Sequence, residues 1–469
     1  MFVGRTEELH TLERLYTRPN FQMLVLYGRR RVGKTTLIDE FVRDKPCLYF
    51  TAKQQSNALN LRGFSRKVIE FFSFPATSPS FATWSDALDF VSERAHDNKP
   101  FVFVFDEFPY AALADKSLPS ALQIAIDHGF KTTNVTMILS GSNEGFMSSN
   151  VLGSKSPLYG RRTAQIRLLP FDYADAALFL PNTPATQCIE YYATFGGTPY
   201  YLSQIDESMS YHDNMLELCF SRSGLLFEEP LMLLRQELRE PALYSSILQA
   251  IANGSSTLKT IAEHSGVEYS AISKYIATLE GLGLIERIVP FGESPTTSRK
   301  GQYRIRDPFF AYWYRFVSDN TDLIESGGGE AAAEESAFTE AFDTYVGQQF
   351  ETVCTQWLSR ANRAKRLPFL ATQFGKWWGT DPKTHQQTDI DVLAGNTRTH
   401  QLIAGECKWR SRLNVADTID TLRSRAEIPK GYSERYLALF VKTQELADIA
   451  RQRDDSILVK CADELFEDR

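Results

Sequence analysis

The chain has no long apolar run. Its 469 residues contain no uninterrupted apolar stretch of about 18 residues, the minimum for a membrane-spanning helix, and the N-terminus lacks the apolar core of a signal peptide. The six cysteines are scattered and form no C-x-x-C pair, which argues against a disulfide framework or a zinc site. These absences predict a cytoplasmic protein without a membrane partner.

Positive charge is not in excess either. The formal net charge is −7, so the surface as a whole does not indicate a nucleic-acid-binding protein, and broad nonspecific binding to DNA is disfavoured. A local basic groove is compatible with this charge. The hydrophobic fraction of 43% and the charged fraction of 23% are ordinary for a globular protein, and the length suggests about three domains.

What the sequence does contain, up to about residue 180, is an alternation of apolar runs and helical stretches. Phe21–Leu26, Phe101–Phe105 and Val135–Leu139 are continuous apolar runs, and Thr35–Val42 is an amphipathic helix. Continuous apolar strands separated by helices predict a parallel sheet that is covered on both faces. The expected fold class is therefore α/β and multidomain, with a parallel-sheet core over residues 1–180.

A P-loop motif follows the first of these strands. The residues from Gly28 to Thr35 fit G-x-x-x-x-G-K-[ST] without a mismatch, between an apolar strand and a helix. Gly28 and Gly33 allow the backbone N–H groups to face phosphate oxygens. Lys34 is expected to reach the β- and γ-phosphates, and Thr35 to bind Mg²⁺. The alternative is a chance glycine-rich turn. The expected cofactors are ATP and Mg²⁺.

Two carboxylates end the second apolar run. Asp106 and Glu107 follow it directly, at the end of a strand where ligands bind in open α/β sheets. Asp106 is expected to hold Mg²⁺, and Glu107 to orient and deprotonate the attacking water. The alternative, an acidic strand end at the surface, is disfavoured because so apolar a strand is buried. The residues expected to bind the nucleotide are Gly28, Arg31, Gly33, Lys34, Thr35, Thr36 and Asp106.

Polar and basic residues follow the third apolar run. The segment 140–143 reads Ser-Gly-Ser-Asn, which either senses the γ-phosphate or is simply a polar exit from the strand. Arg161 and Arg162 come after a short loop. One of them is a candidate to neutralise the developing charge on the γ-phosphate, in cis or from a neighbouring subunit of a homo-oligomer. The alternative is that both are ordinary surface arginines.

Three further regions are expected beyond the core. Residues 181–240 are helical in pattern, and residues 241–320 read as three helices followed by two strand-like runs, the order of a winged helix-turn-helix. The third helix, which opens with Ser270-Ala271-Ile272-Ser273-Lys274-Tyr275, would contact DNA as the recognition helix. Alternatively, the whole unit would serve as a lid or a protein contact. Ser326–Glu335 is glycine- and alanine-rich and is expected to be a linker or a disordered loop.

The last region, residues 336–469, carries charged residues within apolar surroundings. Glu351 lies on an apolar helix, Asp391 on a strand, and Glu406 and Lys408 on the next strand. The period of two places Glu406 and Lys408 on one face of that strand. Asp391 and Glu406 can then meet across a divalent ion, and Lys408 can ease formation of hydroxide near a scissile phosphate. The alternative is a hairpin whose charges are solvated.

The motifs of the first 235 residues resemble those of the archaeal-type ATPase family of the AAA+/STAND group. The resemblance rests on the P-loop and on the two strand ends. It also rests on Phe2-Val3-Gly4-Arg5, Gly160-Arg161-Arg162 with Pro170-Phe171, and Phe195-Gly196-Gly197-Thr198-Pro199-Tyr200-Tyr201-Leu202. It implies ATP binding and hydrolysis by the core, with a helical lid and a winged helix behind it. It also implies that Gly4-Arg5 lies where the base or ribose is approached.

The C-terminal motifs resemble the PD-(D/E)XK nuclease-like domain that commonly follows this ATPase, which implies a restriction-endonuclease-like α/β fold. The resemblance spans about Val346–Leu422. Glu351 matches the helical acidic residue, Asp391 the metal-binding aspartate, and Glu406 with Lys408 the E-x-K pair. Asp389 stands where this group often has glutamate. The nearby run Lys376-Trp377-Trp378 either helps to bind a nucleic-acid backbone or is surface and core.

Two functions follow as hypotheses. The first is an ATP-dependent enzyme that acts on nucleic acid, DNA above all, through a Mg²⁺-dependent nuclease-like domain. The second is an ATP-switched DNA-binding or regulatory protein whose nuclease-like domain binds without cutting. The residues expected to be catalytic under the first hypothesis are Glu107, Arg161, Arg162, Glu351, Asp391, Glu406 and Lys408.

Overall fold

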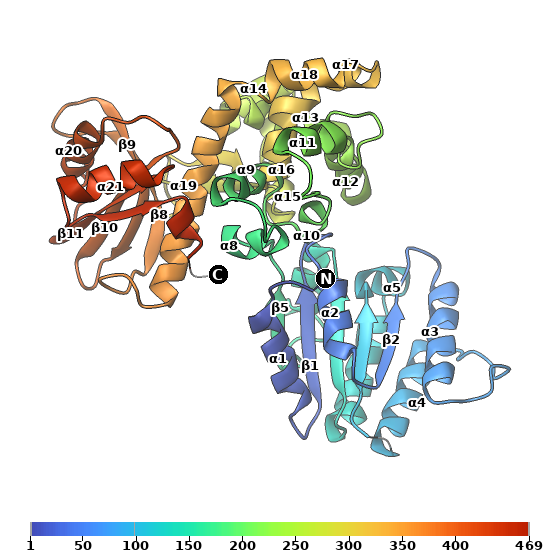
Figure 1. Ribbon diagram of the computed structural model, residues 1–469. Coiled ribbons are helices and arrows are strands. Elements are labelled where there is room, and N and C mark those ends of the chain that lie inside the picture. Colours follow the sequence, from blue (N-terminus) through green and yellow to red (C-terminus); the bar gives the residue numbers. More distant parts are fainter. Residues whose placement is uncertain (1, 98, 468–469) are drawn as a thin grey trace. The chain divides into compact units, whose positions relative to one another are not determined.

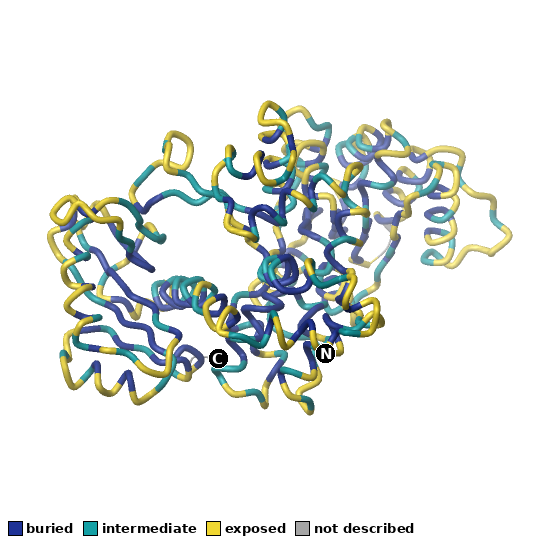
Figure 2. Tube along the Cα trace, turned by 90° about the horizontal axis from the view of Figure 1, so that it is seen from above, coloured by how far each residue is buried: buried dark blue, intermediate teal, exposed yellow. Residues whose placement is uncertain are grey.

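The computed structural model describes residues 2–97 and 99–467, and the chain forms two compact units, Met1–Pro170 (unit 1) and Phe171–Arg469 (unit 2) (Figure 1). In both units the buried residues follow the strands and the packed faces of the helices, whereas many of the connecting loops are exposed (Figure 2). Among the described residues, no helix has the length and apolar character needed to cross a membrane.

Unit 1 is built on a five-stranded parallel sheet with the strand order β2-β3-β4-β1-β5. Its central strands are buried along their whole length because helices cover both faces, so the parallel sheet expected from the continuous apolar runs is confirmed. At the carboxyl edge, Tyr27 of β1 stands level with Gly141 of β4 and Arg167 of β5. The strands are β1 (Gln22–Tyr27), β2 (Cys47–Thr51), β3 (Val102–Asp106), β4 (Thr136–Gly141) and β5 (Ala164–Arg167).

The helices of unit 1 divide between the two faces of this sheet. One face packs against apolar side chains of α1 and α2, and the other against a larger apolar cluster supplied by α3 to α6. Aromatic rings dominate the second cluster; Phe64 of α3 lies 5.3 Å from Phe50 of β2 between ring centroids. The helices are α1 (Thr6–Tyr16), α2 (Lys34–Val42), α3 (Asn57–Phe71), α4 (Trp84–Asp97), α5 (Phe108–Ala114), α6 (Leu118–His128), η1 (Phe130–Thr132), α7 (Glu144–Phe146) and η2 (Met147–Val151).

Unit 2 begins with a helical region. The turn at Gly196-Gly197 requires glycine twice: Gly196 has a φ of 61°, and a Cβ on Gly197 would lie 1.8 Å from the carbonyl oxygen of Phe171. The Phe171 N–H donates to the Gly197 carbonyl at 2.8 Å, which closes this approach. The elements are α8 (Tyr173–Ala176), η3 (Ala177–Phe179), α9 (Ala185–Phe195), α10 (Pro199–Leu202), α11 (Tyr211–Cys219) and α12 (Glu229–Glu237).

Three helices and a two-stranded antiparallel sheet come next, in the order expected from the sequence. The second helix begins with a capping box, in which the Thr257 and Thr260 side chains satisfy each other's backbone N–H groups, and ends at Gly266 with a φ of 70°. The capping box and Gly266 together fix the two ends of this helix and the turn before the third helix. The elements are α13 (Pro241–Ala252), α14 (Leu258–Ser265), α15 (Tyr269–Gly281), β6 (Ile285–Ile288) and β7 (Gln302–Ile305).

The prediction of a linker or a disordered loop over Ser326–Glu335 is wrong. Gly329–Ser336 forms a helix, α18, in which Ala332 and Ala333 are completely buried. A Cβ on Gly329 would lie 1.8 Å from the carbonyl oxygen of Phe220, so this glycine serves close packing and not flexibility. The small side chains let α18 approach α11, η4 (Trp313–Val317) and α17 (Thr321–Glu325). The other elements of this region are α16 (Pro308–Tyr312) and η5 (Ser318–Asn320).

A second five-stranded sheet, of order β12-β11-β10-β9-β8, follows in unit 2. The pairs β8–β9 and β9–β10 are antiparallel, whereas β10–β11 and β11–β12 are parallel. Sequence reasoning anticipated β9 and β10 but assigned no strand to β8. The elements are β8 (Gln373–Thr380), β9 (Gln387–Asn396), β10 (Gln401–Lys408), α20 (Val415–Arg425), β11 (Glu434–Val441), α21 (Gln444–Arg453), β12 (Leu458–Cys461) and η6 (Asp463–Leu465).

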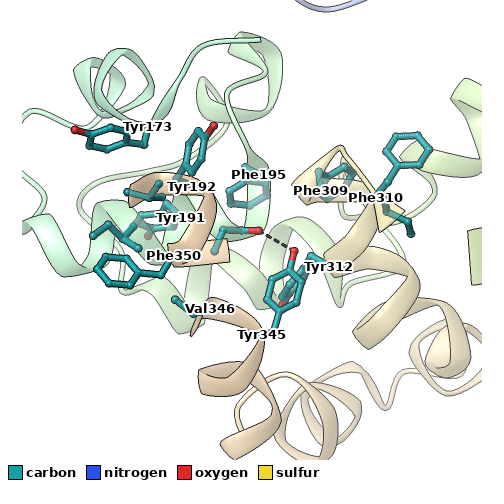
Figure 3. Close-up of a cluster of buried hydrophobic side chains, with 14 of the residues drawn as sticks. Tyr173, Tyr191, Tyr192, Phe195, Phe309, Phe310, Tyr312, Tyr345, Val346 and Phe350 are labelled. Carbon is teal, nitrogen blue, oxygen red and sulfur yellow. Dashed lines mark hydrogen bonds between the residues drawn. The ribbon is translucent and has the colours of Figure 1, made fainter. Parts of the chain in front are cut away.

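A single long helix, α19 (Glu340–Arg363), packs on both the helical region and this sheet. Near its start the Tyr345 hydroxyl lies 2.9 Å from the Ala193 carbonyl oxygen of α9, within a cluster of buried aromatic rings (Figure 3). Further along, the Trp357 ring lies 5.7 Å from Phe440 of β11. One continuous core therefore holds the sheet and the preceding helices of unit 2 together.

Candidate functional site

The P-loop connects β1 to α2 and has the backbone shape that the motif predicts. A Cβ on Gly28 would lie 2.3 Å from the carbonyl oxygen of Leu168, so only glycine fits there. Arg31 has a φ of 71°, and Gly33, the N-cap of α2, has a φ of 90°. The loop thus turns around the N-terminus of α2, where free N–H groups and the helix dipole favour an anion.

Lys34 is buried at the first turn of α2. Its Nζ donates to the carbonyl oxygens of Gly28, at 2.9 Å, and Arg29, at 3.1 Å. Burial lowers the pKa of Lys34, and the nearby carboxylates of Glu107 and Asp106 oppose this shift. Thr35 and Thr36 follow with exposed side chains. The ammonium group is held inside the loop that would surround a phosphate.

The carboxylates after β3 lie at the same edge of the sheet. Asp106 is buried, and burial raises the pKa of its carboxyl group. Glu107 has a φ of 49°, in the left-handed region, which turns the chain into α5. Its Oε2 accepts hydrogen bonds from Ser142, from N–H at 3.1 Å and from the hydroxyl at 2.9 Å. The structure therefore brings Ser142 of the polar strand end into contact with Glu107.

The opening segment reaches the P-loop as well. Gly4 and Arg5 have φ values of 63° and 60°, which reverse the chain before α1. The Arg5 guanidinium donates to the carbonyl oxygens of Val32, at 3.1 Å, and Leu169, at 2.6 Å. Gly4-Arg5 thus ties the P-loop to the segment that follows β5.

The structure places Arg161 and Arg162 away from the P-loop. Thr163 hydrogen bonds to Met23 at the beginning of β1, so both arginines precede the amino edge of the sheet, whereas the P-loop leaves the carboxyl edge. The four residues of β5 separate the two edges by about 13 Å. Arg161 instead binds Asp127 at 2.6 Å and lowers the pKa of that carboxyl group to about 2.

An arginine that sequence reasoning missed lies at the nucleotide edge. Arg167, the last residue of β5, stands level with Tyr27 beside the P-loop and binds the buried Glu144 at 2.7 Å. The negative charge of Glu144 also opposes the lowering of the Lys34 pKa. The position of Arg167 at the end of a strand could have indicated it, because parallel strands all end at the carboxyl edge of the sheet, where ligands bind.

In unit 2, three of the expected site residues meet between β9 and β10. Lys408 Nζ lies 2.5 Å from Glu406 Oε1 and 3.8 Å from Asp391 Oδ2. Asp391 Oδ2 also accepts the Cys407 N–H at 2.9 Å, which fixes that carboxylate against β10. Burial and the Asp391 carboxylate raise the pKa of Glu406.

Glu351 of α19 joins this cluster through a lysine. Lys376 of β8 lies 2.8 Å from Glu351, 3.5 Å from Asp389 and 3.9 Å from Asp391. Burial raises the pKa of Glu351 to about 7, the Asp391 carboxylate adds to this shift, and Lys376 opposes it. Lys376 thus has a contact with site carboxylates that sequence reasoning did not foresee, because β8 was not recognised as a strand.

A cavity of about 960 Å³ opens over these groups, and a further cation lines it. Arg425 of α20 lies 3.8 Å from Glu406 and 3.8 Å from Asp389. Nothing in the spacing of the sequence indicated Arg425, which reaches the site only because α20 packs on β9 and β10. The carboxylates of Glu351, Asp389, Asp391 and Glu406 therefore line one cavity together with the cations of Lys408 and Arg425.

The donor set fits a hydrated divalent cation. Within residues 2–97 and 99–467, no three His, Cys, Asp or Glu side chains are grouped so as to hold a metal ion. Mg²⁺, however, commonly binds one or two carboxylates and keeps several waters. Glu406 Oε2 is buried without a hydrogen-bond partner among the described residues, next to Asp391. Asp391 and Glu406 are the residues that would hold such an ion.

The helix α15 exposes polar side chains, including Ser270, Ser273 and Lys274. In the β6–β7 hairpin that follows, Arg304 of β7 is paired with Glu286 of β6 at 2.7 Å, so the positive charge of this arginine is partly neutralised.

Residues 2–205 match the family described as an ATPase domain predominantly from Archaea, and residues 313–419 match "Archaea bacterial proteins of unknown function". An uncharacterised protein of Methanocaldococcus jannaschii is 30% identical over 410 residues, 87% of this chain and 88% of that protein. An uncharacterised ATP-binding protein of that organism is 53% identical over 45 residues, 10% of this chain and 76% of that protein. A Walker-type ATPase of Pyrococcus abyssi aligns with a TM-score of 0.49 at 21% identity, covering 67% of this chain and 96% of that one.

The first match contains the P-loop and both carboxylates after β3, and the second contains Glu351, Asp391, Glu406 and Lys408 without assigning them an activity. The nucleotide-binding ATPase core expected from the sequence is confirmed. The chain therefore belongs to the archaeal-type ATPase family, with an ATPase domain predominantly from Archaea followed by a C-terminal domain of unknown function.

Proposed function

We propose that the protein hydrolyses ATP with Mg²⁺ and uses its nucleotide state to control a Mg²⁺-dependent, nuclease-like site in unit 2 that acts on DNA. In unit 1 Lys34 would bind the β- and γ-phosphates, and Thr35 and Asp106 would hold the ion. Glu107 would orient the attacking water. The close placement of Lys34, Asp106 and Glu107 at one edge of the sheet supports these roles.

The observation that carries the nuclease proposal is the partnerless, buried Glu406 oxygen in a cavity shared with Asp391 and Lys408. A buried carboxylate oxygen without a partner is costly, and a divalent cation would remove that cost. Bound there, the ion would supply Lewis acidity for a phosphodiester and lower the pKa of a coordinated water. Lys408 would donate a hydrogen bond to the scissile phosphate and stabilise the developing hydroxide.

The test is a cleavage assay on linear DNA, supercoiled DNA and RNA with Mg²⁺ and ATP. We expect the wild type to cleave DNA, and Lys408→Ala and Glu406→Gln each to reduce the rate about 100-fold or more. Lys430→Ala, which removes an exposed lysine of the same unit, is the control and should cleave normally. Absence of cleavage on all substrates by the wild type would refute a nuclease.

The positions of Lys376 and Lys408 favour a second candidate, a nucleic-acid-binding domain that does not cut. Lys376 and Lys408 already neutralise Glu351, Glu406 and Asp391 at short range. Such a domain would bind DNA with an affinity that survives Glu406→Ala and Lys408→Ala, measured by fluorescence anisotropy. Loss of DNA binding in both variants would count against this candidate.

We further propose that α13–α15 with β6–β7 form a winged helix whose α15 faces DNA phosphates. The exposed Lys274 supports this role, and Lys274→Ala should weaken binding about equally on all sequences and reduce the salt dependence by about one phosphate contact. An unchanged affinity and salt dependence would instead support a lid or protein contact. Arg161 or Arg162 would act on a γ-phosphate only in trans, within a homo-oligomer.

A further inference from the structure

Besides the cavity described in unit 2, a large groove of about 1140 Å³ lies in unit 1, between the edge strand β2 and α3. It is lined by Tyr49, Phe50 and Thr51 of the strand and by one side of the helix. Side chains of successive strand residues point to opposite faces of a sheet, so a groove lined by three in a row must reach the edge of the strand itself. Among the described residues, β2 pairs with β3 alone, so the backbone groups of its other edge are open to a further strand.

The groove carries a concentration of positive charge. Lys53, Arg62 and Arg66 line it with exposed side chains, and no described residue forms a hydrogen bond or an ion pair with any of the three side chains. Arg62 and Arg66 are four residues apart on α3, an arrangement of like charges on one side of a helix that destabilises the helix. Lys67, which also lines the groove, is paired with Glu70 at 3.0 Å. Three unpaired cations on one groove of a chain with net charge −7 indicate an anionic ligand.

The apolar side chains and the open strand edge indicate which class of anionic ligand the groove fits. Leu59 and Phe74 line the groove and are 48% and 37% exposed. A groove for single-stranded nucleic acid needs free aromatic faces for stacking, yet Phe74 already has the Arg94 guanidinium 5.3 Å from its ring centroid. An extended peptide, in contrast, uses the three features present here: backbone groups of an edge strand, apolar contacts and fixed charges.

We propose that this groove binds an extended acidic peptide segment of a partner protein, with its main chain along β2 and its carboxylates on Lys53, Arg62 and Arg66. Tyr49 connects the groove to the nucleotide site, because its hydroxyl donates to Asp106 Oδ2 at 3.4 Å. A bound peptide that contacts Tyr49 therefore alters the surroundings of the Asp106 carboxylate. Peptide binding does not depend on the proposed nuclease, and it is measured separately from ATP hydrolysis.

The probe is a fluorescein-labelled peptide of about ten residues in which glutamate alternates with threonine and leucine, titrated with the full-length protein. We expect saturable binding that weakens as salt is raised, and an affinity reduced about tenfold or more by Arg62→Gln with Arg66→Gln. Lys116→Gln with Lys155→Gln, two exposed lysines of unit 1 outside the groove, gives the same charge change and should bind as the wild type does.

The peptide should also change the ATP turnover of the wild type, and Tyr49→Phe should abolish that change while leaving peptide affinity intact. Lys53→Gln is a further variant on a loop, where helix stability is not at stake. Equal affinity in wild type and groove variants, or no binding at all, would overturn the proposal. Tighter binding of an oligothymidylate that competes for the same residues would replace the peptide with a nucleic acid.

Discussion

At the scale of single residues, Glu107 offers the most specific test of the ATPase roles. Glu107→Gln keeps the size of the side chain but removes the carboxylate that would activate water. We expect nucleotide affinity to stay within about threefold, because the phosphate contacts remain, while the rate of ATP hydrolysis falls about 100-fold or more. Binding of a fluorescent ATP analogue and steady-state phosphate release provide the two readouts. Hydrolysis at the wild-type rate would exclude Glu107 as the base.

Sequence spacing predicted those side chains whose partners are close in the chain or fixed by a motif. Lys34, Asp106 and Glu107 follow from a P-loop and from an apolar strand that ends in two acids. Contacts between distant segments could not be predicted in this way. The contacts of Ser142 with Glu107 and of Lys376 with Glu351 depend on how strands and helices pack, and no local pattern records that packing.

At the scale of elements, apolar periodicity located the central strands and helices of both units to within a few residues, because burial sets the pattern. It failed where composition misled. The run Ser326–Glu335 looks like a linker because it is rich in glycine and alanine, but the same small residues permit close helix packing. β8 was missed because its side chains are only half buried along most of its length and show no clear alternation.

The packing of α18 can be tested by placing a charge on each side of it. Ala333 is completely buried, so Ala333→Asp should lower the free energy of unfolding by about 3 kcal/mol or more. Ala331 is exposed on the same helix, and Ala331→Asp should change it by about 0.5 kcal/mol or less. Denaturant unfolding measures both. Similar effects of the two substitutions would mean that this segment is not a packed helix.

A titration checks the contact between α11 and α18. The His212 ring lies 2.8 Å from the Glu334 carboxylate, which raises the pKa of His212. The ion pair is complete below the ordinary pKa of about 6.5 and is lost as pH rises through the raised value, so its stabilisation disappears toward alkaline pH. Both side chains are largely exposed, so the effect on stability should be about 0.5 kcal/mol or less. NMR titration should show a raised pKa for His212 that Glu334→Gln returns toward the ordinary value; an identical pKa in both proteins would contradict the contact.

At the scale of the whole molecule, the sequence predicted a parallel-sheet ATPase core and a second α/β region that carries acidic residues and a lysine on adjoining strands. Both are present, in separate compact units. The sequence placed Glu351 on a helix beside the acidic strands, but it did not predict that this helix, α19, also packs on the helical region. That prediction requires knowing which faces of a long helix are covered. The proposed function requires that the nucleotide state of unit 1 controls the nuclease-like site of unit 2.

The most direct test of that claim is the rate of plasmid nicking with Mg²⁺, with and without ATP, for the wild type, Lys34→Ala and Lys408→Ala. We expect ATP to stimulate nicking by the wild type about tenfold or more, Lys34→Ala to lose the stimulation but keep a basal rate, and Lys408→Ala to lose nicking altogether. Nicking at one rate with and without ATP, unchanged in Lys34→Ala, would contradict the proposed control of the second site by the first.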